Sequence, residues 1–226
     1  MIHHQRLTII RPRPRITVPA GLMAYWSMDR SAITGTTLAD ESGFGYNGTL
    51  VTSPGIVPGV INDALLFNGI NQRVDLPAAA FPGGVNASFT ITGWFNEVSV
   101  SGFQNIFSFK GSSEYYTFGT RGSTMGPWKA GGAFWVSFPA PVANSWHMFA
   151  SGYDGTNHIL WLDGLRVAVA TSALNTSGIT SARIACLAEL NIEFYNGPGE
   201  EFRIYNRILY DSEIYQINSS GLKGTP

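Results

Sequence analysis

The 226-residue chain is poor in cysteine and in charged residues, and these shortages exclude several functions. The single cysteine, Cys186, excludes an internal disulfide, and we expect it to be a small buried apolar residue. Charged residues make up 13% of the chain, about half the usual share, and the net charge is −1. No overall field therefore favours nucleic acid or an anionic membrane. No apolar run reaches the roughly 18 residues that a membrane span requires. We expect no nucleic-acid partner and no membrane span.

Glycine, proline and aromatic residues are abundant by contrast. The chain has 26 glycines and 12 prolines, and 13% of its residues are aromatic. Apolar and polar residues alternate in several short runs that are separated by turn residues, which is typical of an all-β domain. The clearest run is 87–98, in which Phe89 and Ile91 alternate with Thr90 and Thr92. The same signals predict strands at 22–29, 71–76, 103–110, 114–120, 132–138, 145–153, 158–163, 165–170, 183–187 and 200–205.

The C-terminal run 197–217 combines a strand, a turn and a helical turn. Asn206 and Arg207 form the expected turn, and an acid at Asp211 suits the start of a helix, where it would also cap. Ile208, Leu209 and Ile214 follow the strand. We expect these apolar side chains to fill the gap between two sheets.

The segment from Gly197 to Ile214 resembles the closing signature of LamG-like jelly-roll domains, in the concanavalin A-like lectin/glucanase superfamily. An opening signature around Asp40, Ser42 and Asn47 is similar to that of the same family. Three further matches lie between them: a Gly-x4-Ala-x-x-Phe-x-Gly pattern at 59–69, a Phe-Thr-Ile-x-x-Trp run at 89–94, and a Leu-x-x-Asp-Gly turn at 160–164. The resemblance covers 21–222. It implies an all-β, two-sheet antiparallel jelly-roll sandwich over 20–226, preceded by an extended N-terminal arm over 1–19 and closed by one short C-terminal helix.

Many enzymes with this fold cleave polysaccharides, and those similar to laminarinases carry paired acids in a Glu-x-Asp-x-x-Glu run on one strand. A strand's two-residue period brings such carboxylates to one face. This chain has no such run. Glu189 and Glu193 lie four residues apart in an expected loop, and Glu200 and Glu201 would point to opposite faces. We therefore expect a protein that is not an enzyme.

Some relatives hold a structural calcium ion near the opening and closing signatures. The resemblance places Asp29, Asp40, Asn47 and Glu200 at or near such positions, and calcium prefers carboxylate and carbonyl oxygens. The alternative is that Asp40 and Asn47 only brace turns through backbone hydrogen bonds. A bound Ca²⁺ would be structural.

Sugar binding requires an aromatic platform with fixed polar groups. Trp26, Trp94, Trp146 and Trp161 fit core positions in strands. Trp128 instead falls in the Gly/Pro-containing stretch 121–131, which we expect to be a loop, together with Arg121 and Lys129. These three residues are the glycan-binding candidates. An exposed Trp128 would stack on a sugar, pack on a neighbouring subunit, or simply anchor its loop.

The N-terminal arm carries Arg6, Arg11, Arg13 and Arg15 and no acidic residue. Proline at 12 and 14 favours extended backbone, whereas 7–10 and 16–18 have the composition of strands. The arm is either a disordered tail or an anchor that adds a strand to another subunit.

The N-terminal residues show no signal-peptide pattern. With the basic arm and the lack of disulfides, this pattern favours a virion-associated decoration or tail protein that assembles through its arm, as a homo-oligomer or a capsid component. Phage structural proteins often carry LamG-like domains, so the resemblance agrees. The alternative is an extracellular carbohydrate-binding module that recognises surface glycans.

Overall fold

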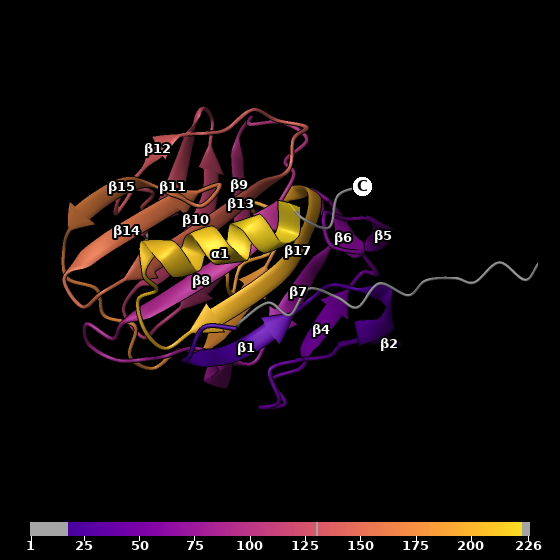
Figure 1. Cartoon of the computed structure of the whole chain (residues 1–226), viewed down its shortest axis with the longest axis horizontal. Helices are drawn as coiled ribbons and strands as arrows, with labels where there is room; N and C mark the ends of the chain where they lie inside the picture. Colours follow the sequence, from indigo (N-terminus) through magenta and orange to yellow (C-terminus); the bar gives the residue numbers. More distant parts are fainter. Residues whose placement is uncertain (1–17, 130, 223–226) are drawn as a thin grey trace, which may run out of the picture.

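The computed structural model describes residues 18–129 and 131–222, which form two stacked β-sheets and one α-helix (Figure 1). Two short 3-10 turns, η1 (Arg30–Ala32) and η2 (Ala78–Ala80), lie in connections between strands. The predicted all-β, two-sheet antiparallel sandwich with a C-terminal helix is confirmed. The arm arginines, Arg6, Arg11, Arg13 and Arg15, lie outside the described residues.

The first sheet has eight strands within the described residues, and each neighbouring pair is antiparallel. In spatial order it contains β15 (Leu165–Thr171), β14 (Asn157–Leu162), β13 (His147–Tyr153), β8 (Phe89–Phe95), β17 (Asn196–Tyr205), β6 (Asp63–Asn68) and β5 (Gly55–Pro58), with β1 (Leu22–Trp26) also paired to β17. Strands from both ends of the chain therefore meet at the centre of this sheet.

The second sheet has nine strands within the described residues and is also antiparallel. Its order is β12 (Phe138–Pro139), β11 (Thr124–Trp128), β10 (Tyr115–Arg121), β9 (Phe103–Lys110), β16 (Ser181–Ile184), β7 (Arg73–Leu76), β4 (Gly48–Val51), β3 (Thr37–Leu38) and β2 (Ile33–Thr34). The end formed by β9, β10, β11 and β12 carries the candidate site described below.

The main core fills the space between the two sheets and is rich in aromatic rings. Phe89 of β8 meets Tyr116 of β10 edge to face, with ring centroids 5.1 Å apart, and Phe118 stacks on Phe149 at 4.6 Å. Alternate residues of each strand supply these rings, as the two-residue period requires. Aromatic pairs of this kind add about 0.5–1.5 kcal/mol beyond the area that they bury.

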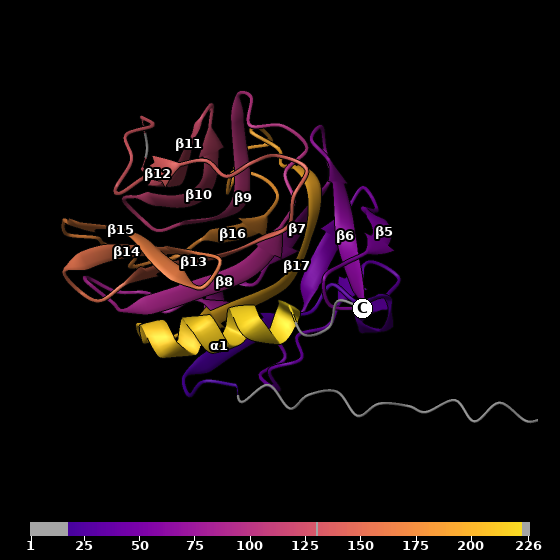
Figure 2. The same cartoon turned by 45° about the horizontal axis from the view of Figure 1, so that its top comes forward.

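The C-terminal helix α1 (Asp211–Leu222) lies across the outer face of the first sheet (Figures 1 and 2). Leu209, Ile214 and Ile217 pack there on Trp94 and Trp161, in a second apolar cluster. The expectation that Ile208, Leu209 and Ile214 fill the gap between the sheets is therefore wrong. That gap is already filled by aromatic residues, whereas the outer face needs a cover for its two tryptophans.

The start of the helix also differs from the prediction. The Glu213 carboxylate, not Asp211, accepts a hydrogen bond from the backbone N–H of Tyr210 at 2.9 Å. The Asp211 carboxylate accepts the indole N–H of Trp161 at 2.7 Å and pairs with Arg166 at 2.8 Å. Asp211 therefore ties the helix to the sheet, while Glu213 provides the capping contact.

Two of the predicted elements between 121 and 138 were assigned incorrectly. Thr124–Trp128, expected as loop, is strand β11, and of the expected strand 132–138 only Phe138 belongs to a strand. Pro127 suggested a loop because proline cannot donate to a ladder. β11 tolerates it because β12 pairs only with Thr124 and Met125, so Pro127 lies where that side of the ladder has ended.

Candidate functional site

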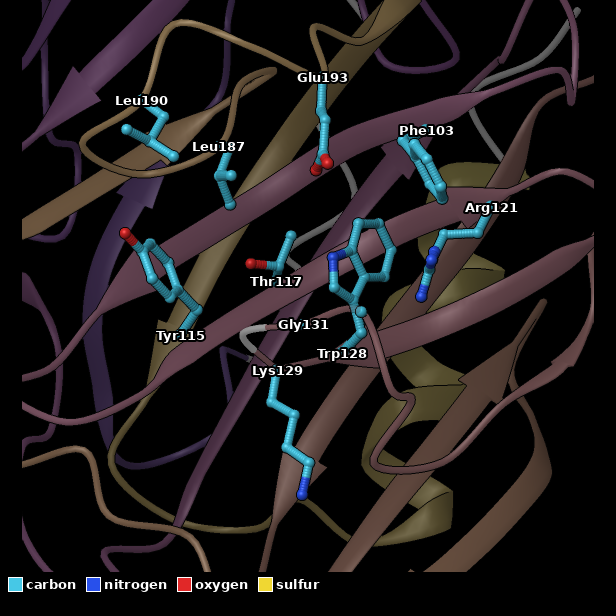
Figure 3. Close-up of a pocket in the computed structure, with 11 residues that line it drawn as sticks. Phe103, Tyr115, Thr117, Arg121, Trp128, Lys129, Gly131, Leu187, Leu190 and Glu193 are labelled. Carbon is cyan, nitrogen blue, oxygen red and sulfur yellow. The ribbon is translucent and has the colours of Figure 1, made fainter.

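A pocket of about 320 Å³ lies on the outer face of the second sheet, over β9, β10 and β11 (Figure 3). Tyr116 and Phe118 of β10 point into the core, so Tyr115 and Thr117 point outward into this pocket. Two loops border it, one contributing Gly132 and the other contributing Leu187, Leu190 and Glu193.

Trp128 forms a wall of this pocket and is only 4% exposed, so the expectation of an exposed loop tryptophan is wrong. Trp128 pairs with Thr117 in the β10–β11 ladder, which puts both side chains on the outer face of the sheet. Phe134 packs edge-on against the indole ring at 5.7 Å. The ring is therefore fixed before any ligand arrives, and its pocket-facing part is what a ligand would meet.

Arg121 is the cation held inside the pocket. Its guanidinium lies over the ring of Phe103 at 4.5 Å and near that of Phe134 at 5.7 Å. A Cβ on Gly132, whose φ is +82°, would come within 2.5 Å of the guanidinium, so this close approach requires glycine. The Arg121 guanidinium makes no hydrogen bond or ion pair with the described residues, which leaves its five N–H donors available.

Other polar groups in the pocket are also unused. The buried hydroxyl of Thr117 has no hydrogen-bond partner among the described residues. The indole N–H of Trp128 points toward the same part of the pocket in Figure 3. The Glu193 carboxylate accepts one hydrogen bond, from the Asn105 side-chain amide at 2.9 Å. Buried polar groups are normally paired, so this grouping of open donors and acceptors indicates a place for a polar ligand.

Lys129 borders the pocket, but its amine points away from it (Figure 3). The amine lies 4.8 Å from the centre of the Trp135 ring. Of the three predicted glycan-binding residues, the structure thus brings Trp128 and Arg121 together and turns Lys129 outward. Phe103, Tyr115 and Thr117 were missed, since nothing in a strand sequence says which face stays uncovered.

The calcium candidates Asp40 and Asn47 brace the opening turn. The Asp40 carboxylate accepts backbone N–H groups of Tyr25, Ser42 and Tyr46, at 3.0, 2.9 and 2.9 Å. Burial opposes ionisation, but the bonds from Ser42 and from these backbone groups outweigh it and lower the pKa of Asp40. The Asn47 side-chain oxygen accepts the backbone N–H of Asp40 at 2.9 Å.

Asp29 and Glu200 are also engaged with neighbouring segments. Asp29 accepts the backbone N–H of Asp63 and the amide of Asn62, at 3.1 and 3.0 Å. Glu200, fully buried, accepts the backbone N–H groups of Val60 at 2.6 Å and Ile61 at 3.2 Å. Burial raises the pKa of Glu200 to about 8 despite these two donors.

Gly59, the first residue of the family-like 59–69 pattern, explains how Glu200 reaches these donors. A Cβ at Gly59 would come within 2.2 Å of the Glu200 carboxylate. The predicted calcium ion stays a prediction. In 18–129 and 131–222, no group of three or more acidic, histidine or cysteine side chains is arranged to hold a metal ion.

Glu201 lies beside Glu200 but belongs to a separate buried cluster. It forms an ion pair with Arg203, and the Tyr25 hydroxyl donates to it at 2.9 Å. The Arg203 guanidinium also lies over the Tyr25 ring at 4.3 Å. Glu201 and Arg203 of β17 and Tyr25 of β1 thus hold the two strands together.

The acids considered for catalysis have separate partners. Glu189 pairs with Lys110 at 3.0 Å and accepts the Thr180 hydroxyl, whereas Glu193 accepts Asn105. Both lie in the expected loop, between β16 and β17. Cys186 is buried as predicted. No helix in the described part of the chain combines the length and apolar character that a membrane crossing needs.

Two stacked antiparallel sheets with one covering helix place the chain in the β-sandwich class. The model of one family, described as concanavalin A-like lectin/glucanases superfamily, matches residues 68–215, and the chain belongs to this family. A comparison with curated protein sequences gives no match.

Solved structures share the fold at low sequence identity. Domain 4 of AbnA, a GH43 extracellular arabinanase from Geobacillus stearothermophilus solved with arabinotriose, has a TM-score of 0.68 at 16% identity, over 87% of this chain and 98% of that domain. The binding domain of botulinum neurotoxin serotype G has a TM-score of 0.64 at 12% identity, and Trypanosoma rangeli sialidase has 0.65 at 15%. The match covers 88% and 89% of this chain, but 50% of the toxin domain and 33% of the sialidase.

Proposed function

We propose that this chain is a non-catalytic carbohydrate-binding module that binds a glycan in the pocket between Trp128, Arg121 and Glu193. The observation that carries the proposal is the set of unused polar groups in that pocket, next to fixed aromatic rings. Within 18–129 and 131–222, no hydrogen bond uses the guanidinium donors of Arg121 or the Thr117 hydroxyl, whereas a sugar has hydroxyls that pair with both.

The chemistry of the pocket suits a sugar ring. A pyranose or furanose has apolar C–H faces that pack on aromatic rings, and hydroxyls at its edge that donate and accept. Phe103, Tyr115 and Trp128 supply the aromatic surface. Arg121 supplies only donors and the Glu193 carboxylate supplies only acceptors, so together they fix the orientation of a vicinal diol.

Two structural neighbours support glycans as the ligand class. The arabinanase domain was solved with arabinotriose, and the botulinum neurotoxin DC binding domain was solved with SialylT. Identity to both is too low to carry a sugar specificity over to this chain. The pocket is therefore assigned to glycans as a class, with the individual sugar left to experiment.

A glycan array followed by isothermal titration calorimetry tests the proposal. The intact chain should bind at least one glycan, and Trp128→Phe, which keeps an aromatic ring of smaller size and removes the indole N–H, should weaken that binding. Tyr210→Phe is a matched control, because Tyr210 is 71% exposed and directly precedes α1, which covers the other sheet. A chain that binds no glycan, or whose binding is unaffected by Trp128→Phe and by changes at Arg121, would contradict the proposal.

The absence of turnover is part of the proposal. Glycosidases need two carboxyl groups that face one another across the scissile bond. Glu193 is the acid among the described pocket-lining residues, and it is held by Asn105. Incubation with the bound glycan should release no reducing ends, whereas release that Glu193→Gln abolishes would identify an enzyme.

The role of the arm stays a prediction, carried by four arginines without an acid. In a virion-associated protein the arm would anchor the module to other subunits; in a secreted or cell-surface module the arm would be dispensable. Removing 1–19 should leave the domain folded, with a melting temperature near that of the full chain. It should abolish oligomerisation or particle incorporation if the virion role holds, and full assembly of the shortened chain would exclude that role.

Structural calcium near Asp29, Asp40, Asn47 and Glu200 is also a prediction. An ion that binds only the native state stabilises it by mass action. Excess chelator should then lower the melting temperature. An unchanged melting curve would contradict the prediction that Ca²⁺ binds the native state.

A further inference from the structure

A second hollow, of about 380 Å³, lies beside the first pocket, and Phe103 lines both. Three separate segments supply its polar groups: the last residue of β6, the loop before β9 and the first residue of β17. These groups are Asn68, Ser99, Ser101 and Asn196. Phe103, the first residue of β9, is 48% exposed and lines both pockets, so its ring is open to a ligand.

We propose that this second pocket is another sugar subsite, so that the ligand is an oligosaccharide whose adjacent units lie on either side of Phe103. The inference rests on the proposed function. It adds that a single sugar fills only half of the site, and that the second unit is chemically different from the first.

The two pockets differ in charge. Arg121 and Glu193 line the first, whereas the lining of the second, among the described residues, includes no charged side chain. Hydroxyls and carboxamides recognise sugar hydroxyls without favouring an ionised group. The second unit is therefore neutral, while the first pocket has the charged partners to orient a more polar unit.

The second pocket also has unused hydrogen-bonding capacity. The Asn196 carboxamide makes no hydrogen bond with any described residue, and its oxygen and NH₂ can serve two neighbouring hydroxyls. The hydroxyls of Ser99 and Ser101 lie 3.1 Å apart, so one of them donates to the other and the pair keeps one proton to donate.

Gln104 holds the walls of this pocket in place. Its amide donates to the backbone carbonyl of Ser99, and its side-chain oxygen accepts the backbone N–H of Asn196 at 2.8 Å. Gln104 is 6% exposed and is a positioning residue. A loop and a strand that are far apart in sequence are thereby fixed in a single arrangement, which lowers the entropy cost of binding.

The two pockets are joined through neighbouring residues. Glu193 lines the first and Phe194, the next residue, lines the second, and a bridge pairs Phe194 with Asn105 of β9. Each pocket is near the small end of the range for ligand sites, roughly 300 Å³, and suits a short piece of a glycan rather than a long one. A chain that passes over Phe103 uses both.

The test compares a monosaccharide with longer glycans. An array that displays one to six sugar units, neutral and acidic, identifies the glycan, and calorimetry then measures Kd for that oligosaccharide and for its single units. Wild type should bind the oligosaccharide at least about ten-fold more tightly than any of its units, the gain expected from one added set of hydrogen bonds.

Two variants locate the second unit. Asn196→Ala should weaken oligosaccharide binding about ten-fold, because it removes a bidentate carboxamide, yet leave the monosaccharide Kd within about two-fold. Phe103→Ala should weaken both, since Phe103 lines both pockets. Phe44→Ala is the control, because Phe44 is 64% exposed on the opening turn.

The outcomes separate the two claims. If wild type binds no glycan on the array, both the proposed function and the second subsite are contradicted. If wild type binds, but its affinity for single units equals that for the oligosaccharide and Asn196→Ala changes neither, the second subsite alone is overturned. Circular dichroism shows whether each variant is folded. If Phe103→Ala does not fold, Asn196→Ala alone decides the result.

Discussion

Two regions of the molecule concentrate charged and polar side chains, and they use them in opposite ways. At the joined ends of β1 and β17, Glu200, Glu201 and Arg203 are buried and are satisfied by the protein itself. On the outer face of β9, β10 and β11, Arg121 and Thr117 have no hydrogen-bond partner among the described residues.

This difference separates scaffold from site. In the segments that resemble the family signatures, polar side chains form hydrogen bonds and an ion pair that hold β1 and β17, from opposite ends of the chain, together. The first pocket lies in segments that carry no such signature, and its polar atoms are open to a ligand. The second pocket meets a signature only at Asn68 and Gly69, where the 59–69 pattern ends. A familiar motif therefore identifies the fold here, while the function resides in the less regular stretches between motifs.

The largest effect that sharpens the comparison is expected at Arg203. Arg203→Met leaves the Glu201 charge buried without its cation, which typically costs about 3–5 kcal/mol. The free energy of unfolding in denaturant should fall by that amount. Arg166→Met is the control, because its pair with Asp211 is exposed and contributes at most about 1 kcal/mol. Equal losses in the two variants would show that the buried cluster has no special structural role.

Next in size is a pH effect at Glu200. Its pKa is raised by burial to about 8 in the folded chain and is ordinary when unfolded. Between about pH 5 and 8 the native state then holds a proton that the unfolded state has lost, so stability falls as pH rises through this window. Glu200→Gln should flatten that fall. A wild-type stability profile that runs parallel to that of Glu200→Gln from pH 5 to 8 would show that Glu200 is already ionised in the fold.

In the pocket, Arg121→Gln should change binding and leave stability alone. Loss of a charged donor costs roughly 1.5–3 kcal/mol of binding, or about ten- to a hundred-fold in Kd. The melting temperature should stay close to that of wild type, because no hydrogen bond or ion pair within the described residues depends on this guanidinium. A large drop in melting temperature with unchanged Kd would place Arg121 in the scaffold.

The smallest effect is expected at Lys129, where the amine lies over Trp135 and points away from the pocket. Lys129→Ala should change Kd by less than about two-fold, as a solvent-exposed charge at the rim of a site does. A loss as large as that of Arg121→Gln would mean that the lysine turns inward when the ligand binds.

The sequence predicts the fold well because strands and turns leave local signals in it. Alternation in 89–95 and 147–153 and the turns at 154–157 and 163–164 are local signals, and the structure places strands and turns there. Trp26 is buried between the sheets, as its strand position predicts, whereas Trp94 and Trp161 are buried because α1 covers the outer face.

The sequence does not predict which segment packs against each face of a sheet. Nothing near Ile214 says that a helix would cover the outside of a sheet, and Pro127 hides β11, whose ladder partner ends two residues earlier. Trp128 and Arg121 were identified as candidates, but as exposed loop residues. Phe103, Thr117 and Asn196 come together only through long-range pairing.

Backbone and side-chain chemical-shift mapping of the ¹⁵N-labelled chain, titrated with the glycan that the array selects, tests the central claim most directly. The account predicts that shifts concentrate at Phe103, Thr117, Arg121, Trp128 and Asn196, while Asp40, Glu200 and Glu201 stay unchanged. Shifts that concentrate instead at Asp40 and Glu200 would show that the signature region binds the ligand, and would contradict the division between scaffold and site.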